Sequence, residues 1–148
     1  MQTFLPYKDF DKSAQVLDMK RLGKQRVETF QVLRALTIPN YGWQSHPAVK
    51  MWRGHITTLY IYQHAICTEW TSRGYKDTCL QKSDNLVTEY YKSLPEGSPA
   101  AEIAPAWLGN EDLHRSHRSN LVRKQPDFYT PLFEADLPDN LEYVWPIQ

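Results

Sequence analysis

The longest helical pattern in the chain runs from Ser13 to Leu36. Apolar residues recur there at intervals of three and four, which places them on one face of a helix. They are Val16, Met19, Gly23, Val27, Phe30 and Leu33. Asp18, Arg21, Gln25 and Glu28 follow the same spacing on another face and form what we call the polar stripe. The pattern predicts one long helix that packs on a core and presents a polar edge.

Three further helices are expected. Pro47 suits the first turn of a long helix that extends to Arg73, and Gly74 is a natural C-terminal stop. A third, weaker pattern covers Thr78–Ser93. The fourth helix begins at Asn110 and ends before Pro126. At the start of the first helix, either Asp11 or Ser13 can provide the cap.

The segments between these helices have different compositions. Met1–Lys12 reads as an extended arm laid onto the domain, and Thr37–His46 has turn chemistry. Tyr41 and Trp43 in that turn are either packing residues or a stacking surface. Leu94–Ala106 contains three prolines and reads as a loop. After Pro126 comes a tail that we expect to pack back on the domain, because it carries the aromatic residues Phe128, Tyr129, Phe133, Tyr143 and Trp145.

These patterns predict an all-α protein, a compact bundle of three to four long helices with irregular loops and an aromatic C-terminal tail. The chain has 148 residues, of which 41% are hydrophobic and 23% charged, so we expect a single folded domain over residues 1–148. No signal peptide and no spanning run of about 20 apolar residues is apparent. We therefore expect a cytoplasmic monomer without a membrane segment, with Cys67 reduced and buried.

Charge is balanced overall but unevenly distributed. Lys and Arg number 17, as do Asp and Glu, which argues against a generally basic coat for nucleic acid. Residues 114–124 nevertheless contain four basic residues and no acid, whereas residues 126–148 contain five acids and no Lys or Arg. Basic groups gathered on one side can meet phosphate even at zero net charge.

The polar stripe has two readings. It is either a solvated helix face with ion pairs that contribute a few tenths of a kcal/mol each, or the edge of a cleft. Arg26 falls on the apolar face, where a guanidinium must find a partner or face a cleft. Lys24 adds basic character beside the stripe.

Two other clusters carry polar chemistry. Gly54 within a predicted helix costs about 1 kcal/mol relative to Ala, which indicates close approach of either another helix or a ligand. It stands between Arg53 and His55, and His55 is either a core histidine or a site residue. The second cluster runs from Leu113 to Asn120 and is read as a phosphate-binding face of Arg, Ser, His and Asn, as a surface helix with His117 half-buried, or as part of a metal site. A metal site would use His46, His55, His114 and His117.

With these residues in view, the chain resembles the pyrimidine-dimer DNA glycosylases, the small phage endonuclease V type, as a divergent member. The resemblance rests on the joint order of several blocks: Leu17 and Arg26-Val27, His46-Pro47, Gly54 to Tyr60, Ser72 to Tyr75, and Gln125 to Tyr129. It implies a compact all-α enzyme that binds damaged DNA and removes a base. In that family the nucleophile is the α-amino group of the first residue, which forms a Schiff base at C1′ of the sugar. An α-amine titrates near ~8 and a lysine near ~10.4, so the terminal amine is the more usable nucleophile.

The chain departs from the family pattern at two places. The bulky Gln2 is expected to leave Met1 in place, so the amine would be that of Met1. The family's catalytic Glu aligns with Gly23 or, shifted by one, with Leu22, and neither is an acid. Glu28 is the nearest carboxylate on the polar stripe and Asp18 the second.

The resulting prediction is a DNA glycosylase for a damaged or modified base, without a cofactor or metal, and with abasic-site lyase activity if the amine chemistry survives. Met1 would supply the amine, Glu28 the carboxylate, Arg21 and Arg26 the contacts to phosphate or sugar, and Gln25 a contact to water or a base edge. DNA contacts are expected from Lys24, His46, Arg53, His55, His117 and Arg118. The alternatives are a non-catalytic nucleic-acid-binding protein of the same fold and a metal-dependent hydrolase.

Overall fold

The computed structural model describes residues 1–98 and 104–146. Within those ranges the regular structure is entirely helical, which confirms the predicted all-α class. The elements are α1 (Phe10–Val16), α2 (Met19–Thr37), α3 (Pro47–Lys50), α4 (Ile56–Ser72), α5 (Cys79–Ser93), α6 (Glu111–Lys124), α7 (Pro126–Tyr129) and the 3-10 turn η1 (Thr130–Leu132). None of the helices in these ranges is both long and apolar enough to cross a lipid bilayer.

The first predicted helix is two helices. The chain leaves the helical conformation at Leu17, and Asp18 caps α2 by accepting the Arg21 N–H at 3.2 Å. The Asp18 N–H donates to the Tyr129 hydroxyl at 2.9 Å, so the backbone group freed by the break has a partner. Asp9 caps α1, not Asp11 or Ser13 as expected.

The buried face of α2 also differs from the predicted one. Leu22, Gln25 and Thr29, which lie off the predicted face, are buried, whereas Met19 and Val27 are 51% and 45% exposed. The reason is that α2 is covered on two sides, by α4 and α5 on one and by the N-terminal residues on the other. Because α2 is covered on two sides, part of its polar stripe is buried as well. A sequence pattern with one apolar face predicts burial on one side only.

The second predicted helix is also divided. Gly54 lies in the turn between α3 and α4 with φ +79°, a conformation that glycine adopts readily. No protein atom lies within 4 Å of where its Cβ would be, so the expected close approach of another helix does not occur. The third and fourth helices agree with prediction, with Asn110 capping α6 through the Leu113 N–H. Residues 99–103 of the predicted loop Leu94–Ala106 lie outside the described residues.

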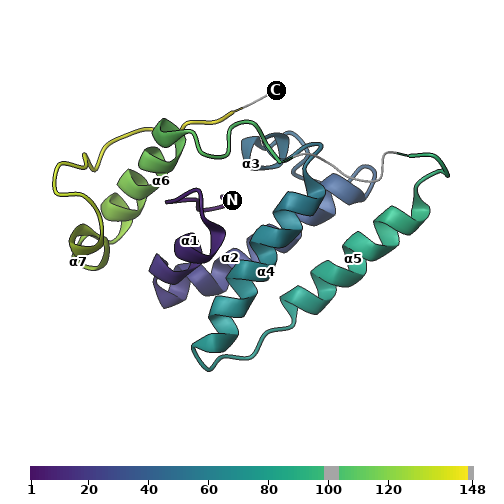
Figure 1. Ribbon diagram of the computed structural model, residues 1–148, viewed down its shortest axis with the longest axis horizontal. Helices are drawn as coiled ribbons and strands as arrows, with labels where there is room; N and C mark the ends of the chain where they lie inside the picture. Colours follow the sequence, from purple (N-terminus) through teal and green to yellow (C-terminus); the bar gives the residue numbers. More distant parts are fainter. Residues whose placement is uncertain (99–103, 147–148) are drawn as a thin grey trace.

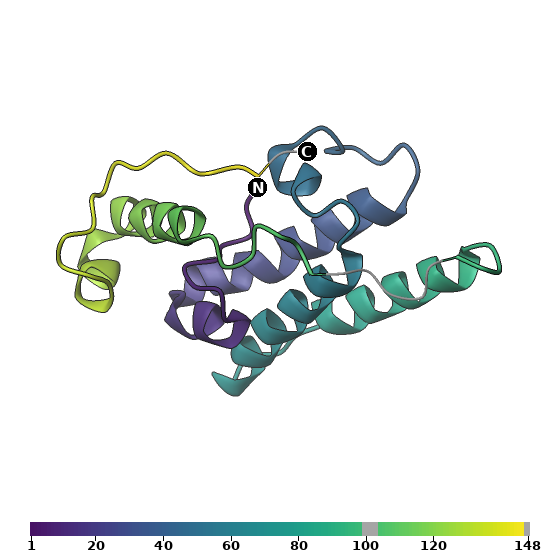
Figure 2. The same ribbon diagram turned by 45° about the horizontal axis from the view of Figure 1, so that its top comes forward.

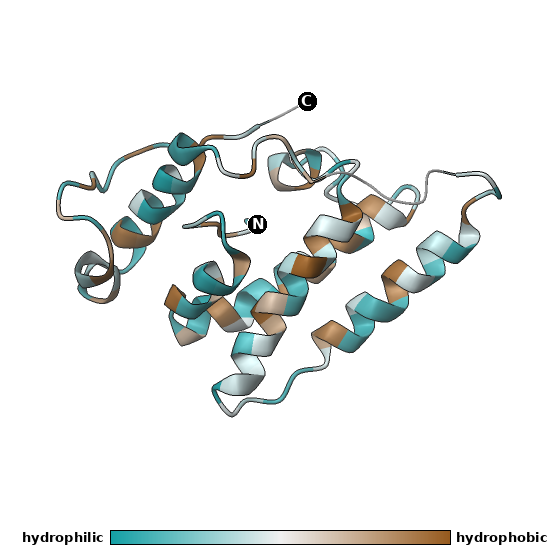
Figure 3. Ribbon diagram, viewed as in Figure 1, coloured by the Kyte–Doolittle hydropathy of each residue, from teal (hydrophilic) through white to brown (hydrophobic). Residues whose placement is uncertain are grey.

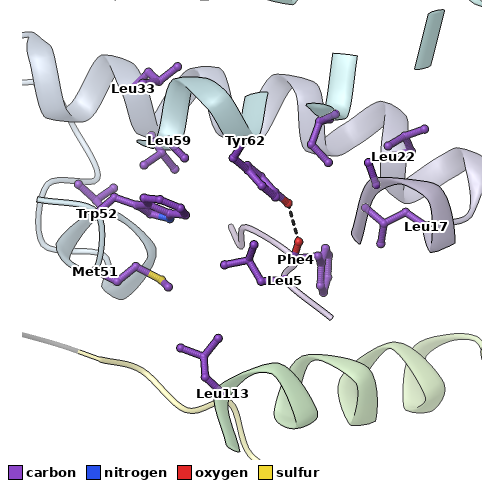
Figure 4. Packing of buried hydrophobic residues seen from close by; sticks show 14 of the residues in the cluster. Phe4, Leu5, Leu17, Leu22, Leu33, Met51, Trp52, Leu59, Tyr62 and Leu113 are labelled. Carbon is purple, nitrogen blue, oxygen red and sulfur yellow. Dashed lines mark hydrogen bonds between the residues drawn. The ribbon is translucent and has the colours of Figure 1, made fainter. Parts of the chain in front are cut away.

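Helices α2, α4 and α5 pack together, and α1 packs on α4 (Figure 1). Helices α6 and α7 form the other side of the molecule, and the N-terminal residues lie between the two groups (Figures 1 and 4). Leu5 sits in the middle of the core, with Trp52 and Tyr62 on one side and Leu113 of α6 on the other. Both cysteines are buried and unpaired.

Helix α6 is buried although its sequence is largely hydrophilic (Figure 3). Its buried residues are Leu113, His114, Ser116, His117, Arg118, Ser119, Asn120 and Leu121. The C-terminal tail runs from α7 back along α6 to the N-terminus and α3 (Figures 1 and 2). Asn120 Nδ2 donates to the Leu141 carbonyl at 3.0 Å, and the Val144 N–H donates to Ser116 Oγ at 3.2 Å. The tail therefore packs back on the domain, as predicted.

Replacing Gly23 with alanine is expected to lower the free energy of unfolding by about 1–2 kcal/mol. The added Cβ would lie 2.9 Å from Trp70 Cη2. The indole is held in place, since its Nε1 donates to the Lys76 carbonyl at 2.9 Å and its ring stacks on Tyr75. Overpacking costs about 1–3 kcal/mol, and the better helix propensity of Ala returns up to ~1 kcal/mol. Urea unfolding measures the difference. Gly42→Ala, where the Cβ meets nothing within 4 Å, should stay within about 0.5 kcal/mol of wild type.

Candidate active site

The chain's first residues are buried in extended conformation, and side chains satisfy their backbone groups. We call Gln2–Tyr7 the N-terminal segment. Gln25 uses both ends of its amide: Nε2 donates to the Gln2 carbonyl at 2.8 Å, and Oε1 accepts the Phe4 N–H at 3.0 Å. The Tyr62 hydroxyl donates to the Phe4 carbonyl at 2.6 Å (Figure 4). Gln25, which is 1% exposed, thus positions this segment, and its contact to water or a base edge stays a prediction.

Helix α6 binds the same segment from the other side. His117 Nδ1 accepts the Leu5 N–H at 2.8 Å, and His114 Nδ1 lies 2.8 Å from the Leu5 carbonyl. The Gly109 N–H donates to His114 Nε2 at 3.0 Å, so the His114 proton is on Nδ1 and points at Leu5. Arg118 Nη1 donates to the Pro6 carbonyl at 2.8 Å.

The predicted DNA face on α6 is therefore wrong for His117 and Arg118. His117 is fully buried, and this burial, together with the nearby His114, lowers its pKa to about 3. Its Nδ1 is also occupied, since it accepts the Leu5 N–H. Arg118 is 5% exposed and pairs with Glu134 at 3.0 Å and Glu111 at 2.5 Å. Both side chains therefore bind other groups of the protein. His114 and His117 do not form a metal-ligand pair either, since backbone groups occupy both nitrogens of His114 and Nδ1 of His117.

The N-terminal segment opens into a pocket of about 280 Å³. We call it the N-terminal pocket. It is lined by Met1, Gln2, Phe4, Lys20, Arg21, Lys24, Gln25, Glu28, Lys124 and Tyr143. Four of these side chains are cations and Glu28 is the single acid, so the pocket is strongly positive. Three members of the polar stripe, Arg21, Gln25 and Glu28, line a cleft and do not form a merely solvated face.

Glu28 lies next to the N-terminus of the chain. Its Oε2 accepts the Gln2 N–H at 3.2 Å, and its Oε1 lies 3.6 Å from Lys24 Nζ. The Glu28 side chain is 15% exposed, whereas that of Lys24 is 74% exposed. A carboxylate that is held in place and one residue from the terminal amine can act on a group that the amine contacts.

Arg21 forms one wall of the N-terminal pocket and is oriented by two acceptors. Its Nη1 lies 3.2 Å from Asp18 Oδ1 and donates to Gln125 Oε1 at 2.8 Å. Burial opposes ionisation of Asp18, but hydrogen bonds from the Tyr129 hydroxyl and from Arg21 outweigh it, and the pKa of Asp18 is lowered. Asp18 therefore serves as an anionic anchor for Arg21 and as the cap of α2.

Arg26 points away from the N-terminal pocket, toward α5. Its Nη1 lies 2.5 Å from Asp77 Oδ1, and its guanidinium lies 4.4 Å from the centre of the Trp70 ring. Asp77 in turn accepts the N–H groups of Cys79 and Leu80 at the start of α5. The partner required for a guanidinium on an apolar face is thus Asp77, and the structure does not place Arg26 with Arg21 and Glu28.

The remaining predicted DNA contacts lie elsewhere. His46 caps α3, its Nδ1 accepting the Ala48 N–H at 3.0 Å. Burial lowers the pKa of His46, the terminal amine lowers it further, and Glu28 opposes them, so His46 lies within electrostatic reach of both groups. Arg53 is exposed and donates to the Gln44 carbonyl at 2.5 Å, and His55 is buried at the start of α4.

The two positions that align with the family's catalytic acid do not reach the N-terminal pocket. Leu22 is fully buried in the core, and Gly23 packs against Trp70. Within residues 1–98 and 104–146, no three His, Cys, Asp or Glu side chains lie close enough together to hold a metal ion. Glu28 is the carboxylate that the fold brings to the N-terminus.

The family model for pyrimidine dimer DNA glycosylase matches residues 1–83. This chain belongs to that family. The match covers the N-terminal segment, α2 and α4, and therefore most of the N-terminal pocket, but not α6 or the tail. No curated protein and no solved structure matches the chain.

Two residues of the N-terminal pocket that come from the C-terminal part of the chain were missed in the sequence. Lys124 comes from the end of α6 and Tyr143 from the tail, far from Met1 in the chain. Burial raises the pKa of Tyr143, so its hydroxyl stays protonated. The aromatic content of the tail predicted packing, but no local signal indicated where it would pack.

Acid is expected to destabilise the protein through His117. In the unfolded chain His117 has an ordinary pKa near ~6.5, whereas in the folded protein its pKa is about 3. Between these two pH values the unfolded state therefore binds a proton that the folded state does not. The contribution of the neutral His117 to the free energy of unfolding should therefore be fully present above about pH 6.5. It should be lost as the pH is lowered toward 3, by up to ~1.4 kcal/mol per pH unit. His117→Asn keeps an acceptor near the Leu5 N–H and removes this titration, so its free energy of unfolding should depend less steeply on pH in that window. Denaturant unfolding at a series of pH values measures the slopes.

The exposed His64 provides the control, because His64→Gln should retain the wild-type slope. Equal slopes for wild type and His117→Asn would contradict the assignment of this acid sensitivity to His117.

Proposed function

We propose that this protein is a DNA glycosylase that removes a damaged or modified base, with the Met1 amine as nucleophile and Glu28 as the carboxylate beside it. The family is one of DNA glycosylases, and membership suggests DNA repair activity. The observation that carries the residue assignment is the contact between Glu28 and the Gln2 N–H, at 3.2 Å in a pocket that Met1 lines.

The proposed chemistry follows from these two groups. The nitrogen lone pair of the Met1 amine forms a bond to C1′ of the sugar, while the bond from C1′ to the base breaks and its electron pair leaves with the base, which takes up a proton. Glu28 stabilises the positive charge that develops on the sugar and accepts the proton that the attacking amine loses. The nitrogen lone pair then forms the second C1′–N bond as the C1′–O4′ bond breaks, and O4′ takes up the proton held by Glu28. The product is a Schiff base between C1′ and the amine.

The cations of the N-terminal pocket would hold the phosphates that flank the target nucleotide. Lys20, Lys24 and Arg21 come from successive turns of α2, and Lys124 faces them from α6. Lysine acts as a mobile point charge, whereas Arg21 is fixed by Asp18 and Gln125 and offers directed donors. DNA binding should therefore weaken steeply with salt.

The N-terminal segment supplies the positioning that such an amine needs. Its backbone is bound by Gln25 and Tyr62 on one side and by His114, His117 and Arg118 on the other. A terminal amine is normally mobile, and fixing the residues that follow it lowers the entropic cost of reaching C1′.

Sodium borohydride is expected to trap a covalent adduct between the protein and DNA that contains an abasic site. Reduction converts a Schiff base to a stable amine, and peptide mapping by mass spectrometry should locate the DNA on Met1. Acetylation of the terminal amine removes the nucleophile and should reduce the adduct at least about tenfold. Lys24→Ala removes a neighbouring amine and a phosphate contact, so the adduct should be weaker but still map to Met1. DNA found on Lys20, Lys24 or Lys124 would refute the role of Met1.

Glu28→Gln is expected to slow base release by about 10²–10⁴-fold, the range for loss of a general acid–base group. The amide oxygen can still accept the Gln2 N–H, so folding, followed by circular dichroism, and DNA binding should persist. Glu89→Gln on the exposed face of α5 is the matched control and should retain full activity. The assay is release of the base from DNAs that bear different lesions or modified bases. If Glu28→Gln releases the base at the normal rate, the carboxylate assignment is wrong. If the wild-type protein binds DNA but releases no base from any of these substrates, the protein is a non-catalytic nucleic-acid-binding protein.

A further inference from the structure

Trp43 is the most exposed large hydrophobic residue in the described part of the chain, at 60%. It also has φ +72°, a left-handed conformation that a bulky residue rarely adopts. Each feature is unfavourable for folding, and strained residues of this kind cluster at ligand-binding sites. Trp43 lies in the turn that joins α2 to α3.

Hydrogen bonds hold this turn in place. The His46 N–H donates to the Trp43 carbonyl at 2.9 Å. On the next residue, Gln44 Nε2 donates to the Ile38 carbonyl at 3.2 Å, and Arg53 Nη2 donates to the Gln44 carbonyl at 2.5 Å. The outward position of the indole is therefore built into the fold.

The neighbouring Tyr41 shows the contrast. Its ring lies 5.0 Å from the Arg34 guanidinium and packs against the core cluster. Of the two aromatic residues that the sequence left open between packing and stacking, Tyr41 packs and Trp43 presents its ring to solvent.

A continuous row of rings connects Trp43 with the N-terminal pocket. We call Trp43, His46, Trp145 and Tyr143 the aromatic row. Successive ring centres are 6.1 Å, 6.3 Å and 5.6 Å apart. Tyr143 lines the N-terminal pocket, and the described part of the tail that carries it passes the N-terminus (Figure 2) and brings Trp145 to His46 at the start of α3. The exposed indole is thus the outer end of a surface that begins at the proposed active site.

The spacing suits a DNA strand. Glu28 and Ala35 are seven residues apart on α2, which is about 10 Å along the helix axis. Gln44 Nε2 lies 3.4 Å from the Ala35 carbonyl, so the turn with Trp43 sits over this end of α2. Stacked nucleotides rise by about 3.4 Å per step, so 10 Å corresponds to roughly three nucleotides.

We propose that Trp43, backed by His46 and Trp145, stacks on an unpaired base of DNA about three nucleotides from the target nucleotide in the N-terminal pocket. The inference rests on the proposed function and names its substrate class: DNA whose pairing is already broken next to the lesion. Every base offers a face to an indole, whereas a continuous duplex hides these faces from it. The positive N-terminal pocket at the inner end of the row attracts a phosphate strand, which favours DNA over an apolar protein partner.

The test compares two duplexes that carry a tetrahydrofuran abasic analogue, one fully paired and one with an unpaired 2-aminopurine three nucleotides from the analogue. The analogue has no base to release and forms no Schiff base, so the result does not depend on the amine chemistry. Wild type should bind the unpaired duplex more tightly and quench the 2-aminopurine fluorescence. Trp43→Ala should lose about five- to hundredfold in affinity for the unpaired duplex and little for the paired one. Trp43→Phe should keep most of the preference, and Tyr75→Ala, which removes another exposed aromatic residue, should match wild type.

Three outcomes would overturn the proposal. In the first, Trp43→Ala binds both duplexes like wild type. In the second, it loses equally on both, which indicates a general surface contact. In the third, sedimentation shows that wild type is a dimer and Trp43→Ala a monomer, which assigns the surface to a second copy of the chain. If the wild-type protein binds neither duplex, both the proposed function and this inference are wrong. If the wild-type protein releases a base from DNA but Trp43→Ala binds both duplexes as tightly as wild type, only this inference is wrong.

Discussion

The structure depends on the need to satisfy the buried backbone of the N-terminal segment. An extended chain in a protein interior carries N–H and C=O groups that cost free energy unless they are hydrogen-bonded. No strand pairs with these residues in the described part of the chain, so side chains from α2, α4 and α6 supply the partners. Each bond is directional, and together they fix the position of the chain's first residues. The helices are thus arranged around a segment that is itself not helical.

This requirement explains the unusual composition of α6. A helix between two extended segments needs donors and acceptors on opposite sides, and α6 provides His114, His117 and Arg118 for the N-terminal segment. On its other side Ser116 and Asn120 bind the C-terminal tail. The polar sequence that resembles a phosphate-binding face is therefore an interior hydrogen-bonding surface. Water is excluded from it, which makes each bond more consequential than it would be at the surface.

The same geometry separates Arg26 from the polar stripe of α2. Consecutive helical residues differ by about 100° in direction, so Gln25 faces the N-terminal segment while Arg26 faces Asp77 and α5. One turn further, Glu28 meets the Gln2 N–H at the edge of the N-terminal pocket. A carboxylate, the chain's end and several cations are therefore brought together because a single helix contacts both the segment and the open pocket.

The sequence by itself determined the helical class, the extent of α5 and α6, and a polar stripe in α2 that includes Glu28, because these follow from local periodicity and capping. Family membership was also readable in the ordered blocks of the N-terminal half. Only the tertiary structure decided that the helices around Asp18 and Gly54 are divided, that Arg26 pairs with Asp77, and that His117 and Arg118 are interior. It also brought Lys124 and Tyr143 to Met1. These outcomes depend on partners distant in the chain, and a one-dimensional pattern shows which groups need partners but not which ones they meet.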